Sequence, residues 1–184
     1  MASFFTRGGD EGYTGLLGEG RVPKYDAVME ALGAVDEANA CLGVARTLCQ
    51  SATSRELVIS VQRHLYALMA EVAATPENAE RFRSMDASHV VWLEEQTDAI
   101  HQLAPTPKDF ILPGDTPAGA ALDVARAVVR RAERRVVELA HKGWLKNAEL
   151  MRYLNRLSSL IFVLEIYENQ LAGYDQSTLA KDNG

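Results

Sequence analysis

Five arginines lie within ten residues, from position 126 to position 135, in a chain that carries only 14. On a helix, which turns by about 100° per residue, Arg126, Arg130 and Arg134 share a face with Glu133, and this face borders an apolar stripe. Cations beside a buried stripe repel one another unless an anion or an acidic partner neutralises them. Guanidinium groups bind phosphate oxygens in a bidentate manner, so the spacing predicts a phosphate site. The alternative is a solvated basic face in which Glu133 bridges Arg130 or Arg134.

The glycine-rich start of the chain, residues 1–25, is a second segment that could bind an anion. Six of the 13 glycines lie in the first twenty residues, among several hydroxyl side chains, and Lys24 follows them. Such a loop can turn several backbone N–H groups towards phosphate oxygens. The spacing GxxxxGK[ST] of a P-loop is absent, and a flexible terminus is the alternative interpretation.

Composition narrows the class of partner. Lys and Arg number 19 and Asp and Glu number 25, so the net charge of -6 argues against a general nucleic-acid binder or a polybasic membrane binder. A chain of 184 residues that is 47% hydrophobic is typical of one folded domain. The start lacks the pattern of a secretory signal, and the two cysteines are too far apart on one predicted helix for a disulfide. We therefore expect a cytoplasmic protein with no nucleic-acid or membrane partner.

The elements that position these segments are predicted to be helices. Apolar residues recur at a spacing of three to four in five stretches, and each stretch has a start signal. These signals are Asp26, the capping-box pattern Thr53–Glu56, Asp86, Thr116 followed by proline, and Asn147. No stretch shows strand-like alternation. We predict an all-α fold, a five-helix up-and-down bundle over residues 26–173 with a loop at 1–25 and a polar, frayed tail at 174–184. The predicted helices span about residues 26–49, 53–74, 86–103, 116–142 and 147–173.

Five ordered blocks of this sequence resemble the all-helical trimeric ATP:cob(I)alamin adenosyltransferases, and the match covers about residues 3–172. The blocks are the loop 6–24, Ala34–Glu37, Phe110–Gly114, Arg130–Arg135 and Tyr153–Ser158. The resemblance implies that cob(I)alamin attacks the 5′-carbon of ATP, which yields adenosylcobalamin and triphosphate. It also implies a homotrimer with active sites between adjacent subunits, and Mg²⁺ bound with the ATP. A reductase and an adenosylcobalamin-dependent enzyme would be its protein partners.

The resemblance assigns roles to matching positions. Asp36 would pair with Arg126 across the subunit boundary, and Phe110 would lie on the lower face of the corrin ring, where it displaces the lower axial ligand. These residues and Arg130 are the candidate catalytic residues, and Phe110 is the candidate cobalamin-binding residue. No metal ligand is assigned. The candidate ATP-binding residues are Thr6, Arg7, Gly8, Gly9, Thr14, Gly15, Lys24, Arg130, Glu133, Arg134 and Asn155.

The chain departs from the family pattern at two loop positions. Gly8 stands where family members often carry threonine, and Asp115 stands where a second glycine commonly follows Pro-Gly. Without the resemblance, the residue types have simpler explanations: Phe110 as an apolar anchor, Asp36 as a solvated helix residue, and Asn155 as a partner in an interhelical hydrogen bond.

Two other functions are alternatives. A non-catalytic nucleotide sensor would share the ATP site but lack the cobalamin side, so Phe110 discriminates between the two. A di-metal helical bundle uses Glu-x-x-His on two helices. Glu138 and His141 fit that pattern once, and Asp86–His89 and Asp98–His101 are near-matches with a shorter acid.

Overall fold

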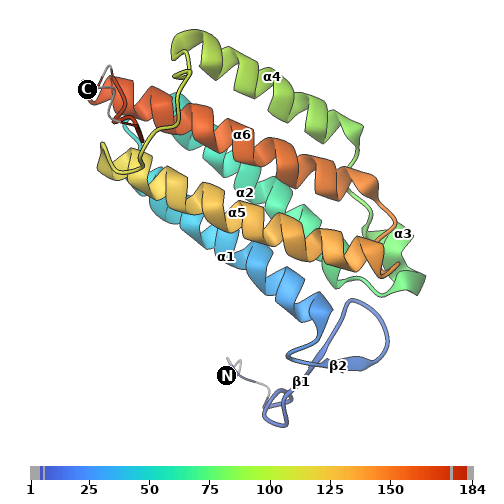
Figure 1. The fold of residues 1–184 in the computed structure, drawn as a ribbon. Coiled ribbons are helices and arrows are strands. Elements are labelled where there is room, and N and C mark those ends of the chain that lie inside the picture. Colours follow the sequence, from blue (N-terminus) through green and yellow to red (C-terminus); the bar gives the residue numbers. More distant parts are fainter. Residues whose placement is uncertain (1–4, 6, 175, 182–184) are drawn as a thin grey trace.

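The protein is represented by a computed structural model that describes residues 5, 7–174 and 176–181. Most of the described chain is helical, as predicted (Figure 1). Helix α1 packs against α2 and α5, and α6 packs against α5 and α4. The long helices in the described part are α1 (Ala27–Leu48), α2 (Ala52–Ala73), α4 (Ala87–Leu103), α5 (Pro117–His141) and α6 (Ala148–Leu171).

Side-chain caps set the helix starts. Asp26 accepts a hydrogen bond from the N–H of Val28 at 2.9 Å, and Thr116 Oγ1 accepts one from the N–H of Gly119 at 2.9 Å. Asn147 caps α6 in the same way, and Asp86 caps α4. These four predicted starts are therefore confirmed.

The predicted start of α2 is wrong by two residues. Ser51 is the N-cap, and its Oγ accepts a hydrogen bond from the N–H of Ser54 at 3.4 Å. The turn before α2 is held by the buried carboxylate of Glu168, which accepts the N–H groups of Gln50 at 2.7 Å and Ser51 at 3.2 Å. Because this contact comes from α6, the local pattern Thr53–Glu56 does not reveal it.

Four small elements were not predicted. Strands β1 (Tyr13–Gly15) and β2 (Arg21–Pro23) pair antiparallel in the glycine-rich segment. A 3₁₀ turn η1 (Pro76–Asn78) and a short helix α3 (Ala79–Phe82) connect α2 to α4. Strands of three residues are too short to show periodic alternation, so the prediction of no strand is wrong for this segment.

The core lies where the predicted apolar stripes of α1, α5 and α6 meet. Leu42, Leu122, Val129 and Leu157 are fully buried in it. Burial of each such side chain contributes about 1.5–3 kcal/mol to folding. Within the described residues, no helix is both long enough and apolar enough to span a bilayer.

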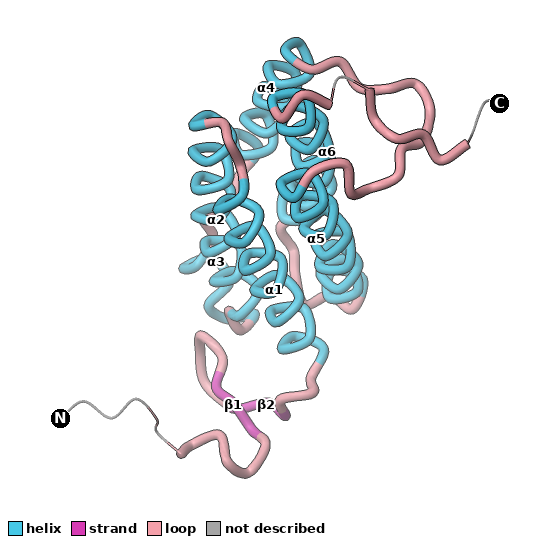
Figure 2. The backbone as a smooth tube through the Cα atoms, turned by 90° about the vertical axis from the view of Figure 1, so that its left-hand side faces the viewer, coloured by secondary structure: helices cyan, strands magenta, loops and turns pink. Residues whose placement is uncertain are grey.

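The two ends of the helical body carry different appendages (Figures 1 and 2). The β1–β2 hairpin extends beyond the beginning of α1, and it contacts the end of α2 through the N–H of Leu17, which donates to Ala73 O at 2.8 Å. At the opposite end lie the loop 104–116 and the C-terminal segment 176–181.

The described C-terminal segment is paired with that loop, in contrast to the frayed tail that was predicted. The N–H of Leu112 donates to Thr178 O, and the N–H of Ala180 donates to Phe110 O, both at 2.8 Å. Asp115 accepts hydrogen bonds from Thr178 N at 3.0 Å and Thr178 Oγ1 at 2.6 Å. The departure from the family pattern at Asp115 thus fastens the C-terminal segment to the loop that carries Phe110.

Candidate active site

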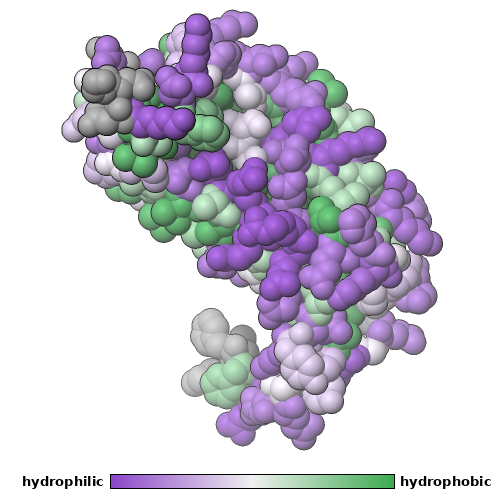
Figure 3. Space-filling model, in the orientation of Figure 1, coloured by the Kyte–Doolittle hydropathy of each residue, from purple (hydrophilic) through white to green (hydrophobic). Residues whose placement is uncertain are grey.

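Helix α5 buries its apolar stripe and exposes its arginines. Arg130 and Arg134 are exposed, and neither has an ion-pair partner among the described residues. The predicted alternative, in which Glu133 bridges these arginines, is wrong for the described chain, because Glu133 accepts a hydrogen bond from Asn155 Nδ2 at 2.9 Å. Among the described residues, no acid neutralises the positive charge of Arg130 and Arg134 by an ion pair. Figure 3 shows hydrophilic side chains gathered over the middle of α5 and α6.

Asn155 ties α6 to this face of α5. Its side-chain oxygen accepts from Arg156 Nη1 at 2.7 Å, and Arg156 Nε donates to Glu94 of α4 at 2.9 Å. The interhelical hydrogen bond considered for Asn155 is thus confirmed. It holds the carboxylate of Glu133, whose position in the sequence lies between Arg130 and Arg134. The series of hydrogen bonds that runs from Glu94 through Arg156 and Asn155 to Glu133 orients these side chains.

Asp36 and Arg126 have different surroundings. Asp36 is exposed on α1 and has no ion-pair partner among the described residues, whereas its neighbour Glu37 pairs with Arg131 of α5. Arg126 pairs within the chain with Asp123, with Nη2 at 2.6 Å from Oδ1. The Asp36–Arg126 pair concerns two subunits, so a single chain does not test it and it stays a prediction.

The hairpin segment brings Lys24 against the glycine-rich turn. A Cβ added to Gly9 would lie 3.0 Å from Lys24 Nζ, and the N–H of Lys24 donates to Gly12 O at 2.8 Å. Arg7, beside Gly8, adopts a positive φ of 58°. An ammonium group beside a turn of small residues is suited to binding an anion. Thr14 and Gly15 lie on β1, and Thr6 lies outside the described residues.

One chain does not bring the hairpin to the arginine face. Both views place β1 and β2 beyond the beginning of α1, away from the middle of α5 (Figures 1 and 2). The predicted ATP-binding residues therefore form two separate groups in a single subunit. One group is Arg7, Gly8, Gly9, Thr14, Gly15 and Lys24, and the other is Arg130, Glu133, Arg134 and Asn155.

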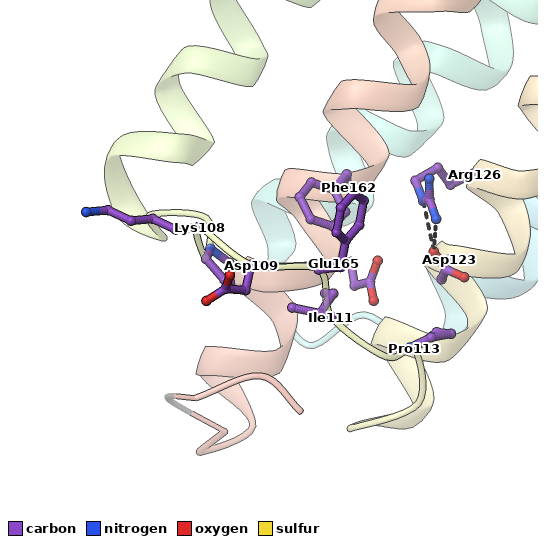
Figure 4. A pocket seen from close by; sticks show the side chains of 10 residues that line it. Lys108, Asp109, Ile111, Pro113, Asp123, Arg126, Phe162 and Glu165 are labelled. Carbon is purple, nitrogen blue, oxygen red and sulfur yellow. Dashed lines mark hydrogen bonds and ion pairs between the residues drawn. The ribbon is translucent and has the colours of Figure 1, made fainter. Parts of the chain in front are cut away.

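Near the beginning of α5 lies a pocket of about 400 Å³ (Figure 4). Phe110 lines it and is 88% exposed, so the alternative interpretation of Phe110 as an apolar anchor is wrong. Arg126 faces the same pocket, with its guanidinium carbon 5.9 Å from the centre of the Phe162 ring. The pocket therefore combines open aromatic surface with two cations, Lys108 and Arg126, and Arg126 is already paired with Asp123.

Sequence reasoning missed Glu165, which also lines this pocket. It is 1% exposed, and its Oε2 has no hydrogen-bond partner among the described residues. Burial, with a further contribution from the charge of Asp123, raises the pKa of Glu165 to about 7, although Arg126 opposes the rise. The available signal was an acid four residues after Ile161 within the apolar stripe of α6.

Three residues of the di-metal alternative have other partners. Glu138 pairs with Lys142 at 2.7 Å and with Arg135 at 3.2 Å, and Asp86 and His89 form the capping box of α4. Among the described residues, no three His, Cys, Asp or Glu side chains are grouped as metal ligands.

Comparison with known proteins places the chain in one family. The sequence model of the cobalamin adenosyltransferase family matches residues 4–168 of this chain. The corrinoid adenosyltransferase of Mycobacterium bovis is 38% identical over 176 residues, which cover 92% of this chain and 90% of the relative. The corrinoid adenosyltransferase PduO of Citrobacter freundii is 36% identical over 163 residues, which cover 88% of this chain. The chain spans about half of that relative's length, 48%.

Solved structures agree in fold. A phenylalanine-to-alanine variant of the PduO-type ATP:corrinoid adenosyltransferase of Lactobacillus reuteri, complexed with cobalamin and ATP, superposes with a TM-score of 0.89 at 32% identity. The match covers 98% of this chain and 100% of that one. An arginine-to-lysine variant of the L. reuteri protein, complexed with ATP, gives a TM-score of 0.87 at 32% identity and covers 97% and 100%. This chain therefore belongs to the cobalamin adenosyltransferase family.

Proposed function

We propose that the protein transfers the 5′-deoxyadenosyl group of ATP to cob(I)alamin. The observation that carries the proposal is the pairing, on α5 and α6, of an unneutralised arginine face with an open pocket lined by Phe110. The first suits a triphosphate and the second suits a large planar ring. The named activity of the relatives and the cobalamin and ATP bound by the L. reuteri structure support the same reaction.

The reaction asks for alignment and charge rather than acid–base catalysis. The electron pair of cob(I)alamin forms the bond to the 5′-carbon, and the C–O bond breaks with its pair on the triphosphate. Arg130, Arg134 and Lys24 supply positive charge where the leaving group gains negative charge, which lowers the barrier. Asn155 holds Glu133 by a hydrogen bond, and Glu133 forms no ion pair with Arg130 or Arg134 among the described residues.

The ATP site is proposed to lie between subunits of a homotrimer of five-helix up-and-down bundles. Support comes from the hairpin, which stands clear of its own α5 and is free to cover the α5 of a neighbour. A neighbouring hairpin would add Arg7, Gly8, Gly9, Thr14 and Gly15, with Thr6 ahead of them. In the trimer, Asp36 of one subunit would pair with Arg126 of the next, in addition to its partner Asp123.

Magnesium is proposed to enter with ATP. The described residues hold no group of three acidic or imidazole ligands, and Mg²⁺ characteristically binds phosphate oxygens and water with one or two carboxylates. The ion would add to the charge that Lys24 and the arginines provide.

Phe110 is proposed to contact the lower face of the corrin ring. Its exposure of 88% leaves the ring free to contact a ligand, and the hydrogen bond between Phe110 O and the N–H of Ala180 holds its backbone. Displacement of the lower axial ligand would give four-coordinate cob(II)alamin, which is easier to reduce. A reductase would supply that electron, and an adenosylcobalamin-dependent enzyme would use the product. The pocket around Phe110 favours catalysis over the alternative of a non-catalytic nucleotide sensor.

The deciding experiment is anaerobic incubation of the protein with ATP, Mg²⁺ and chemically reduced cobalamin. We expect the absorbance of adenosylcobalamin to appear, and triphosphate to be released in equal amount. Arg135→Ala is the matched control, because Arg135 pairs with Glu138 away from the site. ATP binding with no adenosylcobalamin formed would favour the nucleotide sensor instead.

A further inference from the structure

The strongest unexplained group in the molecule is the carboxyl of Glu165. It lies one turn after Phe162 on α6, it is 1% exposed, and no donor reaches Oε2 among the described residues. Figure 4 shows the carboxyl pointing from α6 towards the space between the loop and α5. A buried polar group without a partner is costly, so such groups are kept where a ligand or a proton satisfies them.

The groups that face Glu165 do not neutralise it. Arg126 is paired with Asp123: its Nη2 lies 2.6 Å from Asp123 Oδ1, and its Nε donates a hydrogen bond to the same oxygen at 2.8 Å. Asp115, from the loop, adds a further negative charge and is itself bonded to Thr178. Lys108 and Asp109 line the pocket together and offset each other in formal charge. The charges of two acids, Asp115 and Asp123, thus act on Glu165 together with that of Arg126, which is already paired with Asp123.

A carboxyl in these surroundings is neutral in a large fraction of molecules near pH 7 and mostly neutral below it. Burial is the largest cause, and it raises the pKa of Glu165 to about 7. A neutral carboxyl carries an O–H, so it can donate a hydrogen bond that a carboxylate cannot. The pocket therefore offers a donor to an uncharged acceptor and repels an anion.

We propose that Glu165 is a specificity residue for the corrinoid, donating a hydrogen bond from its neutral carboxyl to a carboxamide oxygen at the edge of the ring. The neighbouring acids Asp115 and Asp123 disfavour a carboxylate in place of that amide. The site then selects fully amidated corrinoids over those that carry free acids. This inference rests on the proposed function, which supplies the corrinoid.

Equilibrium binding tests the inference without turnover. Spectral titration would give the Kd of cobinamide, whose ring substituents are amides, for wild type and Glu165→Gln at pH 6 and pH 8. For wild type we expect the Kd to rise about fivefold to tenfold between these pH values, as the donor ionises. For Glu165→Gln we expect no change with pH, because the amide N–H stays a donor. A flat wild-type profile, or an equal rise in the variant, would overturn the proposal.

Charge selection has its own measurement. A corrinoid whose side-chain amides are hydrolysed to carboxylates should bind wild type at least about tenfold more weakly than cobinamide at pH 8. Glu165→Gln should reduce that preference. Equal binding of the two corrinoids by wild type would contradict the assigned selection.

Asp109→Asn is the matched control, because Asp109 lines the same pocket from the loop. It should leave the pH dependence of corrinoid binding intact. If it removes that dependence as Glu165→Gln does, general pocket charge is responsible and the assignment to Glu165 fails. Adenosyl transfer by wild type is measured separately, so active protein with pH-independent corrinoid binding would reject this inference alone.

Discussion

The middle of α5 and its first turns present opposite electrostatic environments within about two helical turns. In the middle, Arg130 and Arg134 are exposed and have no acidic partner among the described residues. Near the start, Arg126 is bound by Asp123, and Glu165 is buried where Asp115 adds a further negative charge. One helix therefore carries an unneutralised cationic surface and an acid-rich pocket side by side.

The difference indicates what each region can bind. The arginine face requires negative charge from outside the chain, as a polyphosphate supplies. The pocket offers aromatic surface and a neutral acid, so it suits a large ring without anionic substituents. Removing charge from the first region should lower the rate of adenosyl transfer. Changes in the second region should alter the reaction of the corrinoid and the stability of the protein.

Arg130→Ala should break the arginine face most severely. Loss of a charged donor to the leaving group is expected to lower kcat/KM by about 10²- to 10³-fold. The anaerobic assay with pre-reduced cobalamin measures it, and Arg135→Ala should remain within about twofold of wild type because surface ion pairs contribute little. Near-wild-type turnover of Arg130→Ala would remove it from the site.

Phe110→Ala should damage the pocket and spare the arginine face. We expect a loss of about 10- to 100-fold when the reaction starts from cob(II)alamin with a reductant, and a clearly smaller loss from pre-reduced cob(I)alamin. The KM for ATP should not change. Equal losses from both starting states would contradict a role in displacing the lower ligand.

Asp36→Asn tests whether Arg126, in the second region, also meets an acid across a subunit boundary. Because Asp36 has no ion-pair partner within the described chain, its loss should leave the folded subunit intact while lowering activity by about tenfold. Sedimentation of wild type should show a trimer, and that of the variant should show weakened assembly. Unchanged kinetics and sedimentation would refute the pair with Arg126.

Glu165→Gln should stabilise the protein at neutral and alkaline pH but not at acidic pH. Burial raises the folded-state pKa of Glu165 to about 7, above its ordinary value of 4.5, so the wild type loses stability as pH rises from 4.5 to about 7 and the loss levels off above that. The variant should therefore gain about 2–3 kcal/mol in free energy of unfolding at pH 8 and almost nothing at pH 4. Urea titrations at the two pH values measure the gain. An equal gain at both would show that the charge is not its cause.

Asp115→Asn should have the smallest effect. It weakens the hydrogen bonds to Thr178 and should cost about 1 kcal/mol of local stability. Hydrogen exchange should accelerate at the amides of Leu112 and Ala180, which pair the loop with the C-terminal segment. Protection unchanged at both amides would show that the backbone pairing alone holds the segment.

Much of the helical framework was predictable because its signals are local. Asp26, Thr116 and Asn147 cap the helices that they were predicted to open. The start of α2 was misplaced because Glu168 caps the preceding turn from a distant helix. The β1–β2 pair was missed because three-residue strands are stabilised by pairing with each other and by the contact of the hairpin with α2, and neither is a local sequence signal.

The arginine face was determined by the sequence alone, because the phase of a helix follows from residue spacing. Tertiary structure decided three other properties: the exposure of the Phe110 ring, the ion pair of Arg126 with Asp123, and the burial of Glu165. Burial and charge neutralisation depend on which side chains meet across α5, α6 and the loop, and spacing along one helix carries no such information. The separation of the hairpin from the arginine face is likewise a property of the folded chain.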